Sequence, residues 1–339
     1  MKKTALITGG AGYIGSHTAY LMARNGYDVI VLDNLVHGQT FKHSWATLKK
    51  HDFADVAVLD DIFKTHRIDV VMHFAAFIEV GESVKRPKDF YENNVIKTLT
   101  LLDAMIRHRV KRFVFSSSCA VYGNPEYLPL TEEHPKKPVS PYGNNKLIIE
   151  LALQDYARAY DLHYMSLRYF NASGAFPEAG LGEFHKHETH VIPLMLRAIH
   201  ANQPFNLFGD DYETKDGSCV RDYVHVTDIA NAHMLAAQHL EKTGISEYVN
   251  LGTGYGYSVK ELIKAVERLC NKKMIVNTVK RRPGDPATLV ADPSKAMRIL
   301  AWKPYYSDLD FIIKSALKWE MDNRFFISAG TSLPIHQMR

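Results

Sequence analysis

The chain has 339 residues, 46% of them hydrophobic, so it can bury a large core and is long enough for two lobes. Its formal net charge of +4 is small, and no segment concentrates lysine and arginine, which argues against a nucleic-acid or acidic membrane surface. We expect neither a membrane span nor a signal peptide, because no apolar stretch is long enough and the chain opens directly on a strand-like run. Cys119, Cys219 and Cys270 are far apart and odd in number, which favours a reduced, cytoplasmic protein over a disulfide framework.

A glycine-rich turn follows the first strand-like run, residues 4–8. Gly10, Gly12 and Gly15 fit the pattern G-x-G-x-x-G. Gly9, Gly12 and Gly15 also fit the pattern G-x-x-G-x-x-G. Glycines at such a turn let backbone N–H groups approach a pyrophosphate at the start of a helix. The sequence therefore predicts a dinucleotide site here, with a glycine-rich turn that binds nothing as the alternative.

The identity of the dinucleotide is indicated by the next strand-like run, residues 29–32. It ends in Asp33, at the distance from the glycines where a carboxylate can accept a hydrogen bond from a ribose hydroxyl. A carboxylate would repel a 2′-phosphate, and Asn34, Leu35 and Val36 supply no arginine to attract one. NAD is therefore favoured over NADP.

Strand-like and helix-like runs alternate through the first half. Strands are expected over residues 68–74, 111–116 and 163–168, and helices over 89–108 and 140–160; residues 56–59 fit either class. Such alternation predicts an α/β protein, a Rossmann-type doubly wound parallel sheet covered by helices on both faces.

The regular alternation of strand-like and helix-like runs ends after Asn171. Residues 172–190 resemble a loop, followed by helices near 193–201, 227–240 and 258–270 and by short strands at 223–226 and 248–251. We therefore expect a NAD-binding domain over residues 1–171 and a smaller mixed α/β substrate lobe over 172–339, with some later segments returning to the first domain.

Tyr142 and Lys146 stand at the start of the helix predicted for residues 140–160. Ser140 is a favoured N-cap, and Pro141 suits the first helical position. Side chains four residues apart share one helix face, so the phenol and the ammonium point the same way. A nearby cation favours the phenolate, although a shift of the tyrosine pKa from ~10 to about 7 needs roughly 4 kcal/mol. A helix with one aromatic and one exposed lysine is the alternative.

Three serines, Ser116, Ser117 and Ser118, follow the strand-like run that begins near Lys111. Their hydroxyls are expected where that strand opens into a cleft, although serines at a strand end often serve only as turn residues. With the glycine-rich turn, a serine and Tyr-x-x-x-Lys in this order, the chain resembles the extended short-chain dehydrogenase/reductase family. Within that family it is most similar to the branch of UDP-glucose 4-epimerases. The resemblance covers nearly the whole chain, through segments 8–17, 73–76, 80–83, 167–171, 220–226, 250–254 and 281–286.

The resemblance implies two sets of binding residues. Those implied for NAD are Gly9, Gly12, Tyr13, Ile14, Asp33, Asn34, Asp52, Phe53, Phe74, Ala75, Ala76, Asn93, Ser116, Tyr142, Lys146 and Tyr169. Those implied for the UDP-sugar are Ser118, Tyr142, Asn171, Val191, Phe208, Arg221, Arg282 and Asp285. Arginine suits the substrate because its forked, permanently charged donors match a diphosphate. Asp285 fits either a contact to the nucleotide or the cap of a turn.

The same resemblance implies that Tyr142 takes the proton of the sugar 4-hydroxyl and that Ser118 holds the same oxygen. Lys146 would lower the pKa of the tyrosine and bind the nicotinamide ribose. Epimerases of UDP-N-acetylhexosamines or UDP-pentoses share these motifs and are the alternative; Leu289, of intermediate size beside the sugar, leaves the choice open. Ile78 stands where some family members carry a lysine near the cofactor phosphates, which puts that contact in doubt.

Two rival functions are disfavoured. A sugar-nucleotide 4,6-dehydratase would place acidic residues after Ser118, where this chain has Cys119 and Ala120. A redox-dead NAD-binding scaffold usually loses the tyrosine or the lysine, and this chain keeps both.

Two further expectations concern partners. His185, His187 and His190 lie in a polar segment that we expect to be a solvated loop without metal. The helices predicted at 89–108 and 140–160 carry apolar residues around much of their surface. In this family such helices pair across a two-fold axis, so a homodimer is expected.

Overall fold

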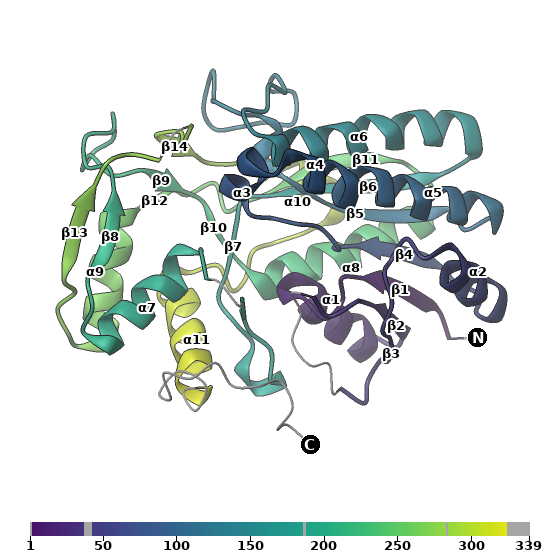
Figure 1. Cartoon of the computed structure of the whole chain (residues 1–339), viewed down its shortest axis with the longest axis horizontal. Helices are drawn as coiled ribbons and strands as arrows, with labels where there is room; N and C mark the ends of the chain where they lie inside the picture. Colours follow the sequence, from purple (N-terminus) through teal and green to yellow (C-terminus); the bar gives the residue numbers. More distant parts are fainter. Residues whose placement is uncertain (1, 37–42, 186–187, 283, 324–339) are drawn as a thin grey trace.

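A seven-stranded parallel sheet forms the centre of the molecule in the computed structural model, which describes residues 2–36, 43–185, 188–282 and 284–323 (Figure 1). In spatial order its strands are β11 (Glu247–Leu251), β6 (His163–Tyr169), β5 (Arg112–Ser118), β4 (Val70–His73), β1 (Thr4–Thr8), β2 (Asp28–Leu32) and β3 (Thr47–Lys49). Every neighbouring pair runs parallel. The predicted Rossmann-type doubly wound sheet is confirmed.

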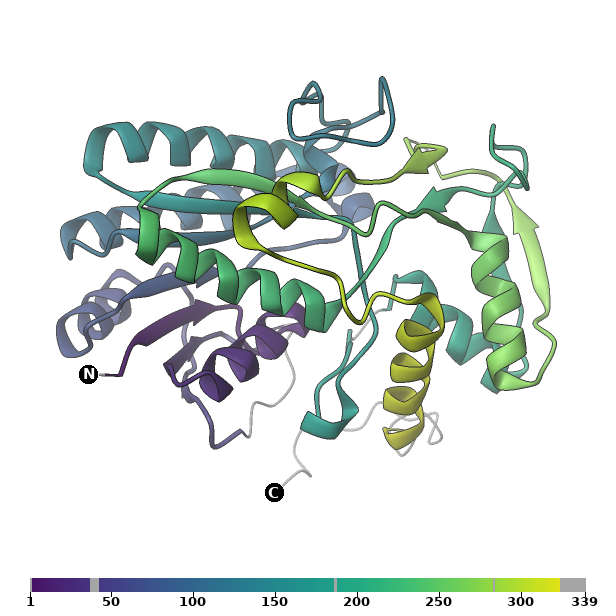
Figure 2. The ribbon, with the colours of Figure 1, turned by 180° about the vertical axis from the view of Figure 1, so that it is seen from behind.

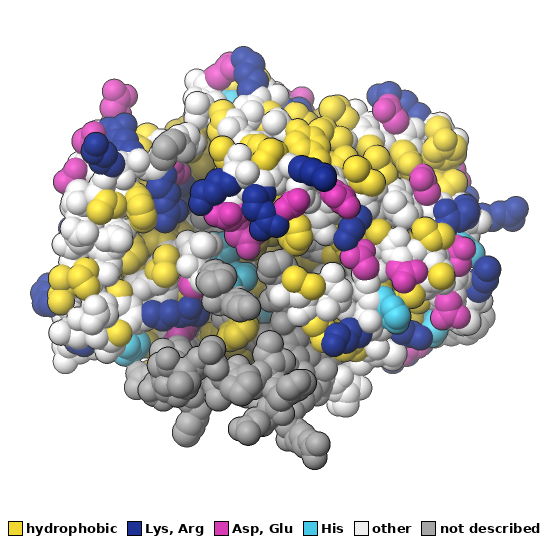
Figure 3. Space-filling model, viewed as in Figure 1, with side chains coloured by type: hydrophobic (Ala, Val, Ile, Leu, Met, Phe, Trp, Pro, Cys, Tyr) yellow, Lys and Arg dark blue, Asp and Glu magenta, His cyan; other side chains and the backbone are white. Residues whose placement is uncertain are grey.

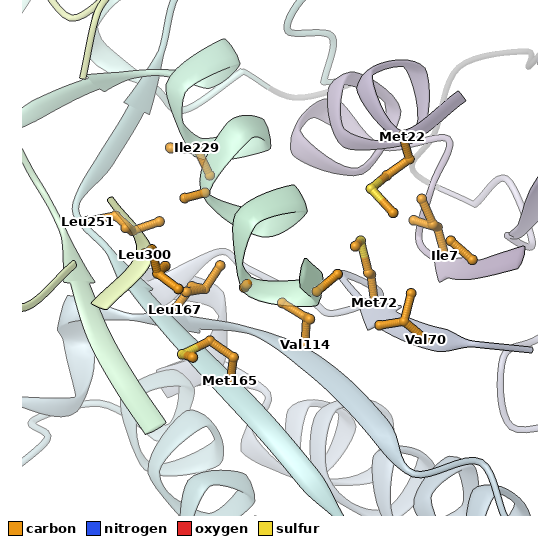
Figure 4. Close-up of a cluster of buried hydrophobic side chains, with 14 of the residues drawn as sticks. Ile7, Met22, Val70, Met72, Val114, Met165, Leu167, Ile229, Leu251 and Leu300 are labelled. Carbon is orange, nitrogen blue, oxygen red and sulfur yellow. The ribbon is translucent and has the colours of Figure 1, made fainter. Parts of the chain in front are cut away.

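Helices cover both faces of this sheet (Figures 1 and 2). One face carries α1 (Tyr13–Arg24), α8 (Val226–Thr243) and α10 (Ser294–Leu300), and the other carries α2 (Val56–Thr65), α5 (Lys97–Arg107) and α6 (Pro141–Tyr160). Successive strand residues point to opposite faces, so Ile7 packs toward the first set of helices and Leu6 toward the second. Figure 4 shows Ile7 and Met72 of the strands facing Met22 of α1.

Two local predictions are resolved by hydrogen bonds and backbone geometry. Residues 56–59 are helical, because the carboxylate of Asp55 caps α2 by accepting from the backbone N–H groups of Ala57 and Val58. The helix predicted at 89–108 consists of α4 (Pro87–Tyr91), a π-helical turn (Glu92–Ile96) and α5. The π-turn buries Asn94. A short helix, α3 (Val80–Lys85), precedes it.

The second half of the chain builds a smaller unit around its own core. Strands β8 (Phe205–Phe208) and β13 (Val276–Val279) pair in parallel beside α7 (Val191–Ala201), α9 (Val259–Cys270) and α11 (Leu309–Asp322). The remaining elements are β7 (Asn171–Ser173), β9 (Val220–Arg221), β10 (Tyr223–His225), β12 (Tyr257–Ser258), β14 (Thr288–Leu289) and the 3₁₀ turns Cys119–Val121 and Pro177–Ala179.

Later segments of the chain return to the central sheet. β11 pairs with β6 at the edge of that sheet, and α8 packs against α1 (Figure 2). The sheet therefore depends on residues from both halves of the sequence. Within residues 2–36, 43–185, 188–282 and 284–323, no helix combines the length and apolar character that crossing a bilayer demands.

Candidate active site

The glycine-rich turn connects β1 to α1 with very little space. Gly9 has a φ of +70°, and a Cβ at Gly15 would lie 2.2 Å from the Gly9 carbonyl oxygen. The backbone of Ala75, which follows β4, would lie 2.5 Å from a Cβ at Gly9. Gly12 is the N-cap of α1 and has no side chain with which to cap it. The uncapped helix start on a tight turn fits the pyrophosphate of a dinucleotide.

Asp33 is held directly beside this turn. Its carboxylate accepts from the backbone N–H of Ala11 at 3.0 Å and from that of Leu35 at 2.8 Å. Asn34, the next residue, accepts from the backbone N–H of Val36 at 3.1 Å. The carboxylate therefore sits at the end of β2 where a ribose hydroxyl is expected.

The other residues implied for the cofactor lie at the same edge of the sheet or just beyond it. Asp52 forms an ion pair with Lys97 of 2.6 Å, and Phe53 is buried with its ring 5.0 Å from that of His73. Phe74 and Ala76, like Ala75, are half-buried after β4. Tyr13 donates to the carbonyl of Gly174 at 2.5 Å, which links α1 to the second half of the chain.

Asn94 was missed by sequence reasoning although its neighbour Asn93 was named. The Asn94 side chain accepts from the backbone N–H of Phe77 at 2.8 Å and donates to its carbonyl at 2.9 Å. Asn93 is half-buried and donates to Asn94 at 3.0 Å. Only the π-turn reveals this arrangement, because it shifts which side chain of the helix points inward.

Ser118, Tyr142 and Lys146 meet where β5 ends and α6 begins. Ser140 caps α6 by accepting from the backbone N–H of Gly143 at 3.1 Å, as predicted. Lys146 is buried and donates from Nζ to the carbonyl of Ser116 at 2.7 Å. Its Nζ lies 5.7 Å from the ring centroid of Tyr142, and Ser118, the last residue of β5, accepts from the backbone N–H of Ala120 at 3.2 Å.

Two neighbours complete this group. Tyr169 of β6 lies opposite Ser118 in the sheet register, and its hydroxyl hydrogen-bonds to that of Ser116. Ser83 of α3, fully buried, accepts from the backbone N–H of Tyr142 at 3.2 Å. Ser83 therefore ties the start of α6 to α3, and Tyr169 ties β6 to β5.

Burial dominates the acid–base properties of this pair. It raises the pKa of Tyr142 to about 12, against an opposing hydrogen bond from Ser118. It lowers the pKa of Lys146 to about 7, against the opposing charge of Glu150. The predicted lowering of the Tyr142 pKa by Lys146 is therefore not seen in the chain alone, where desolvation of the phenolate is the largest cause and Lys146 is not among the causes.

The residues implied for the nucleotide form two contacts in the second half of the chain. The guanidinium of Arg282 lies 4.1 Å from the ring centroid of Phe208, at the end of β8. Arg221 forms an ion pair with Asp285 and donates to the carbonyl of Pro286 at 2.7 Å. Asp285 thus has an internal partner that neither sequence interpretation foresaw.

Three further residues named from the sequence lie on β7, α7 and β14. Asn171 opens β7, where its backbone N–H donates to the carbonyl of Asp222 at 2.9 Å, and Val191 opens α7. Leu289 of β14 is half-buried and pairs with Arg221 of β9. Ile78 is 38% exposed.

Comparisons with known proteins agree with this geometry. The model of the NAD dependent epimerase/dehydratase family matches residues 5–252. The UDP-glucose 4-epimerase of Halalkalibacterium halodurans is 49% identical over 319 residues, which is 94% of this chain and 96% of that protein. The crystal structure of UDP-glucose 4-epimerase from Brucella ovis in complex with NAD is 47% identical with a TM-score of 0.90, covering 93% of this chain and 98% of that one.

A second solved structure extends the likeness. UDP-glucose 4-epimerase from Bifidobacterium longum in complex with NAD+ and UDP is 39% identical with a TM-score of 0.88, covering 95% of this chain and 99% of that one. Sequence and structure therefore agree over nearly the full length of each protein. The chain belongs to the NAD dependent epimerase/dehydratase family, in its branch of UDP-glucose 4-epimerases.

Proposed function

We propose that this protein interconverts UDP-glucose and UDP-galactose by transient oxidation at sugar C4. The observation that carries the proposal is the buried group of Ser118, Tyr142 and Lys146 at the end of the sheet that also presents the glycine-rich turn. A relative named UDP-glucose 4-epimerase aligns over 94% of this chain. The two solved relatives described above contain NAD and NAD+ with UDP, respectively.

Tyr142 is the proposed acid and base of the reaction. Its phenolate accepts the proton of the 4-hydroxyl, while Ser118, at the end of β5, holds the same sugar oxygen. NAD+, which the glycine-rich turn and Asp33 would hold, would supply the acceptor and donor of the C4 hydride and a positively charged ring. Positive charge near Tyr142 favours its phenolate, which Lys146 alone does not achieve in the chain.

The second half of the chain is proposed to anchor the UDP group. Arg282 and Phe208 offer a cation and an aromatic ring 4.1 Å apart, and Arg221 is fixed by Asp285. Anchoring by the remote UDP group lets the 4-keto sugar turn over without leaving. The proton and the hydride are both returned, so the cofactor ends each cycle in its starting state.

The proposal is tested with a panel of four substrates: UDP-glucose, UDP-galactose and their two N-acetyl counterparts. We expect turnover of the first pair in both directions, without added NAD if the cofactor is retained during purification. Turnover of the N-acetyl pair alone would instead support the alternative epimerase. Absence of turnover with all four, in protein that contains NAD, would overturn the proposal.

We further propose a cytoplasmic homodimer. Cys119, Cys219 and Cys270 are free thiols, which supports a reducing compartment. Figure 3 shows hydrophobic side chains gathered over the region that Figure 1 labels α4, α5 and α6, where Ile96 is 59% and Leu151 51% exposed. Light scattering should give twice the mass of the chain, and Ile96→Asp should shift it toward the monomer.

A further inference from the structure

Four side chains in the segment before α7 form a compact Glu–His cluster: Glu183, His185, Glu188 and His190. The described residues of this segment form a loop, as predicted, but it is only partly solvated: His185 and His190 are 19% and 41% exposed, whereas the side chains of Glu183 and Glu188 are only 5% and 3% exposed. His187, also named from the sequence, lies outside the described residues. Two buried carboxylates this close together need positive charge beside them.

The spacing within the Glu–His cluster resembles that of a metal's ligands. All four potential ligand atoms lie within 4.8 Å of one another. His185 Nδ1 lies 3.3 Å from Glu183 Oε1 and 3.6 Å from Glu188 Oε1, and His190 Nδ1 lies 4.0 Å from the same Glu188 oxygen. A tetrahedral zinc ion with bonds of about 2.0–2.2 Å separates its ligand atoms by about 3.3–3.6 Å. The direct contact of His190 with Glu183 is closer than that and would have to open.

His185 supplies a second, independent observation. Its Nδ1 atom is buried and, among the described residues, makes no hydrogen bond of normal geometry, although both carboxylates are near. A buried nitrogen that lies 3.3 and 3.6 Å from two carboxylate oxygens without bonding to either suits a ligand whose metal would occupy the space between them.

The charge balance of the cluster is consistent with one divalent cation. Arg197 lies 3.4 Å from Glu188 but is closer to Glu320, at 2.9 Å, and that carboxylate balances its charge. Glu183 and Glu188 then require two positive charges, which either two protonated histidines or one divalent cation can supply.

We propose that Glu183, His185, Glu188 and His190 bind one divalent cation of the zinc type. Imidazole nitrogen with carboxylate oxygen suits zinc, and four protein ligands make a closed, structural site rather than one with an open position for substrate. The proposed site is independent of the epimerase assignment. The cation would hold the segment that leads into α7 against α11; these two helices lie side by side in Figure 1.

Contacts already link the cluster to α11. Trp319 donates from Nε1 to the carbonyl of Glu183 at 2.8 Å, and Arg197 of α7 reaches Glu320. The cation would therefore stabilise the packing of two helices next to Val191, one of the residues proposed for the nucleotide.

The test is titration of zinc chloride into the full-length, untagged protein after treatment with a chelator. We expect one equivalent to bind, and the heat measured in two buffers should reveal release of the histidine protons, since neutral imidazole is the ligand. Cobalt in place of zinc should give the strong visible absorption of a tetrahedral site. Bound zinc should also raise the temperature of unfolding.

Two variants with a control make the assignment specific. His185→Ala with His190→Ala should weaken zinc binding by more than about 100-fold, because even outer-shell partners contribute about 10–100-fold. Glu188→Gln is a gentler change that should also weaken zinc binding, and it provides the test if the double variant fails to fold. His51→Ala removes an exposed histidine and should bind zinc like the parent. No stoichiometric zinc in the parent, or undiminished binding in the folded variants, would overturn the proposal.

Discussion

Arg168 donates two hydrogen bonds to Glu150, from Nε at 2.8 Å and from Nη2 at 2.6 Å, and both side chains are buried. Glu150 lies one helical turn after Lys146 on α6, and Arg168 lies on β6, so the pair fixes the catalytic helix to the sheet. Ser117 of β5 adds a third bond to the same carboxylate at 2.7 Å. The negative charge of Glu150 also opposes the lowering of the Lys146 pKa.

Glu150→Gln should lower the free energy of unfolding by about 3–5 kcal/mol, because it leaves the charge of Arg168 buried without a counter-ion. Denaturant unfolding followed by circular dichroism measures the change. Asp155→Asn provides the control on the same helix, since it breaks an ion pair with Arg158 in which both side chains are 75% exposed. That change should cost less than about 1 kcal/mol. Equal losses in the two variants would show that the buried pair contributes no special stability.

Tyr142→Phe should reduce turnover of UDP-galactose by about 10²–10⁴-fold, because the ring remains but its oxygen can no longer exchange a proton with the substrate. Bound NAD and the affinity for UDP should be retained, since the change removes one atom from a buried site. Tyr160→Phe, at the exposed end of the same helix, is the control and should keep full activity. Near-normal turnover in Tyr142→Phe would remove this residue from the mechanism.

Gly15→Ala should abolish NAD retention. Its Cβ would lie 2.2 Å from the carbonyl oxygen of Gly9 and 3.0 Å from the Cα of Gly10, both backbone atoms that cannot move aside without opening the turn. The cofactor content of purified protein, measured by absorbance after denaturation, gives the readout. Gly81→Ala is the control, because its Cβ would meet nothing within 4 Å. A Gly15→Ala protein that keeps its NAD would show that the turn does not hold the pyrophosphate.

The sequence predicted those parts of the fold that depend on local patterns. The cap at Ser140, the proline at the first position of α6 and the glycines before α1 each favour their conformation through their own backbone chemistry, and the structure has them there. The parallel sheet followed from alternating runs because parallel strands require covered faces. Strand β3 was missed since its three residues carry no pattern that distinguishes them from a loop.

The parts that escaped prediction depend on distant contacts. Whether Asp285 meets Arg221, 64 positions away, is decided by how β9 and β14 pair, which spacing along the chain does not encode. The same holds for the Glu–His cluster, whose segment looks like a polar loop in sequence, because its contact with Trp319 of α11 joins residues 136 positions apart. The pKa values of Tyr142 and Lys146 were the least predictable property, since burial is the largest cause of both shifts and the sequence does not show how deeply these side chains are buried.

The pKa of Lys146, lowered by burial from 10.5 to about 7, predicts how stability depends on pH in protein freed of dinucleotide. Between pH 7 and about 10.5 the folded state keeps this lysine neutral, whereas the unfolded chain binds a proton there. Unfolding thus takes up a proton in this window, so stability rises with pH across it, and below pH 7 the cost of the buried charge is fully present.

Lys146→Met should remove this rise, worth on the order of a few kcal/mol, as measured by denaturant unfolding at a series of pH values. Lys264→Met, at an exposed position of α9, should leave the slope as in the parent. If the parent and Lys146→Met show the same slope between pH 7 and 10, the lysine is charged in the folded chain and must have a buried counter-ion.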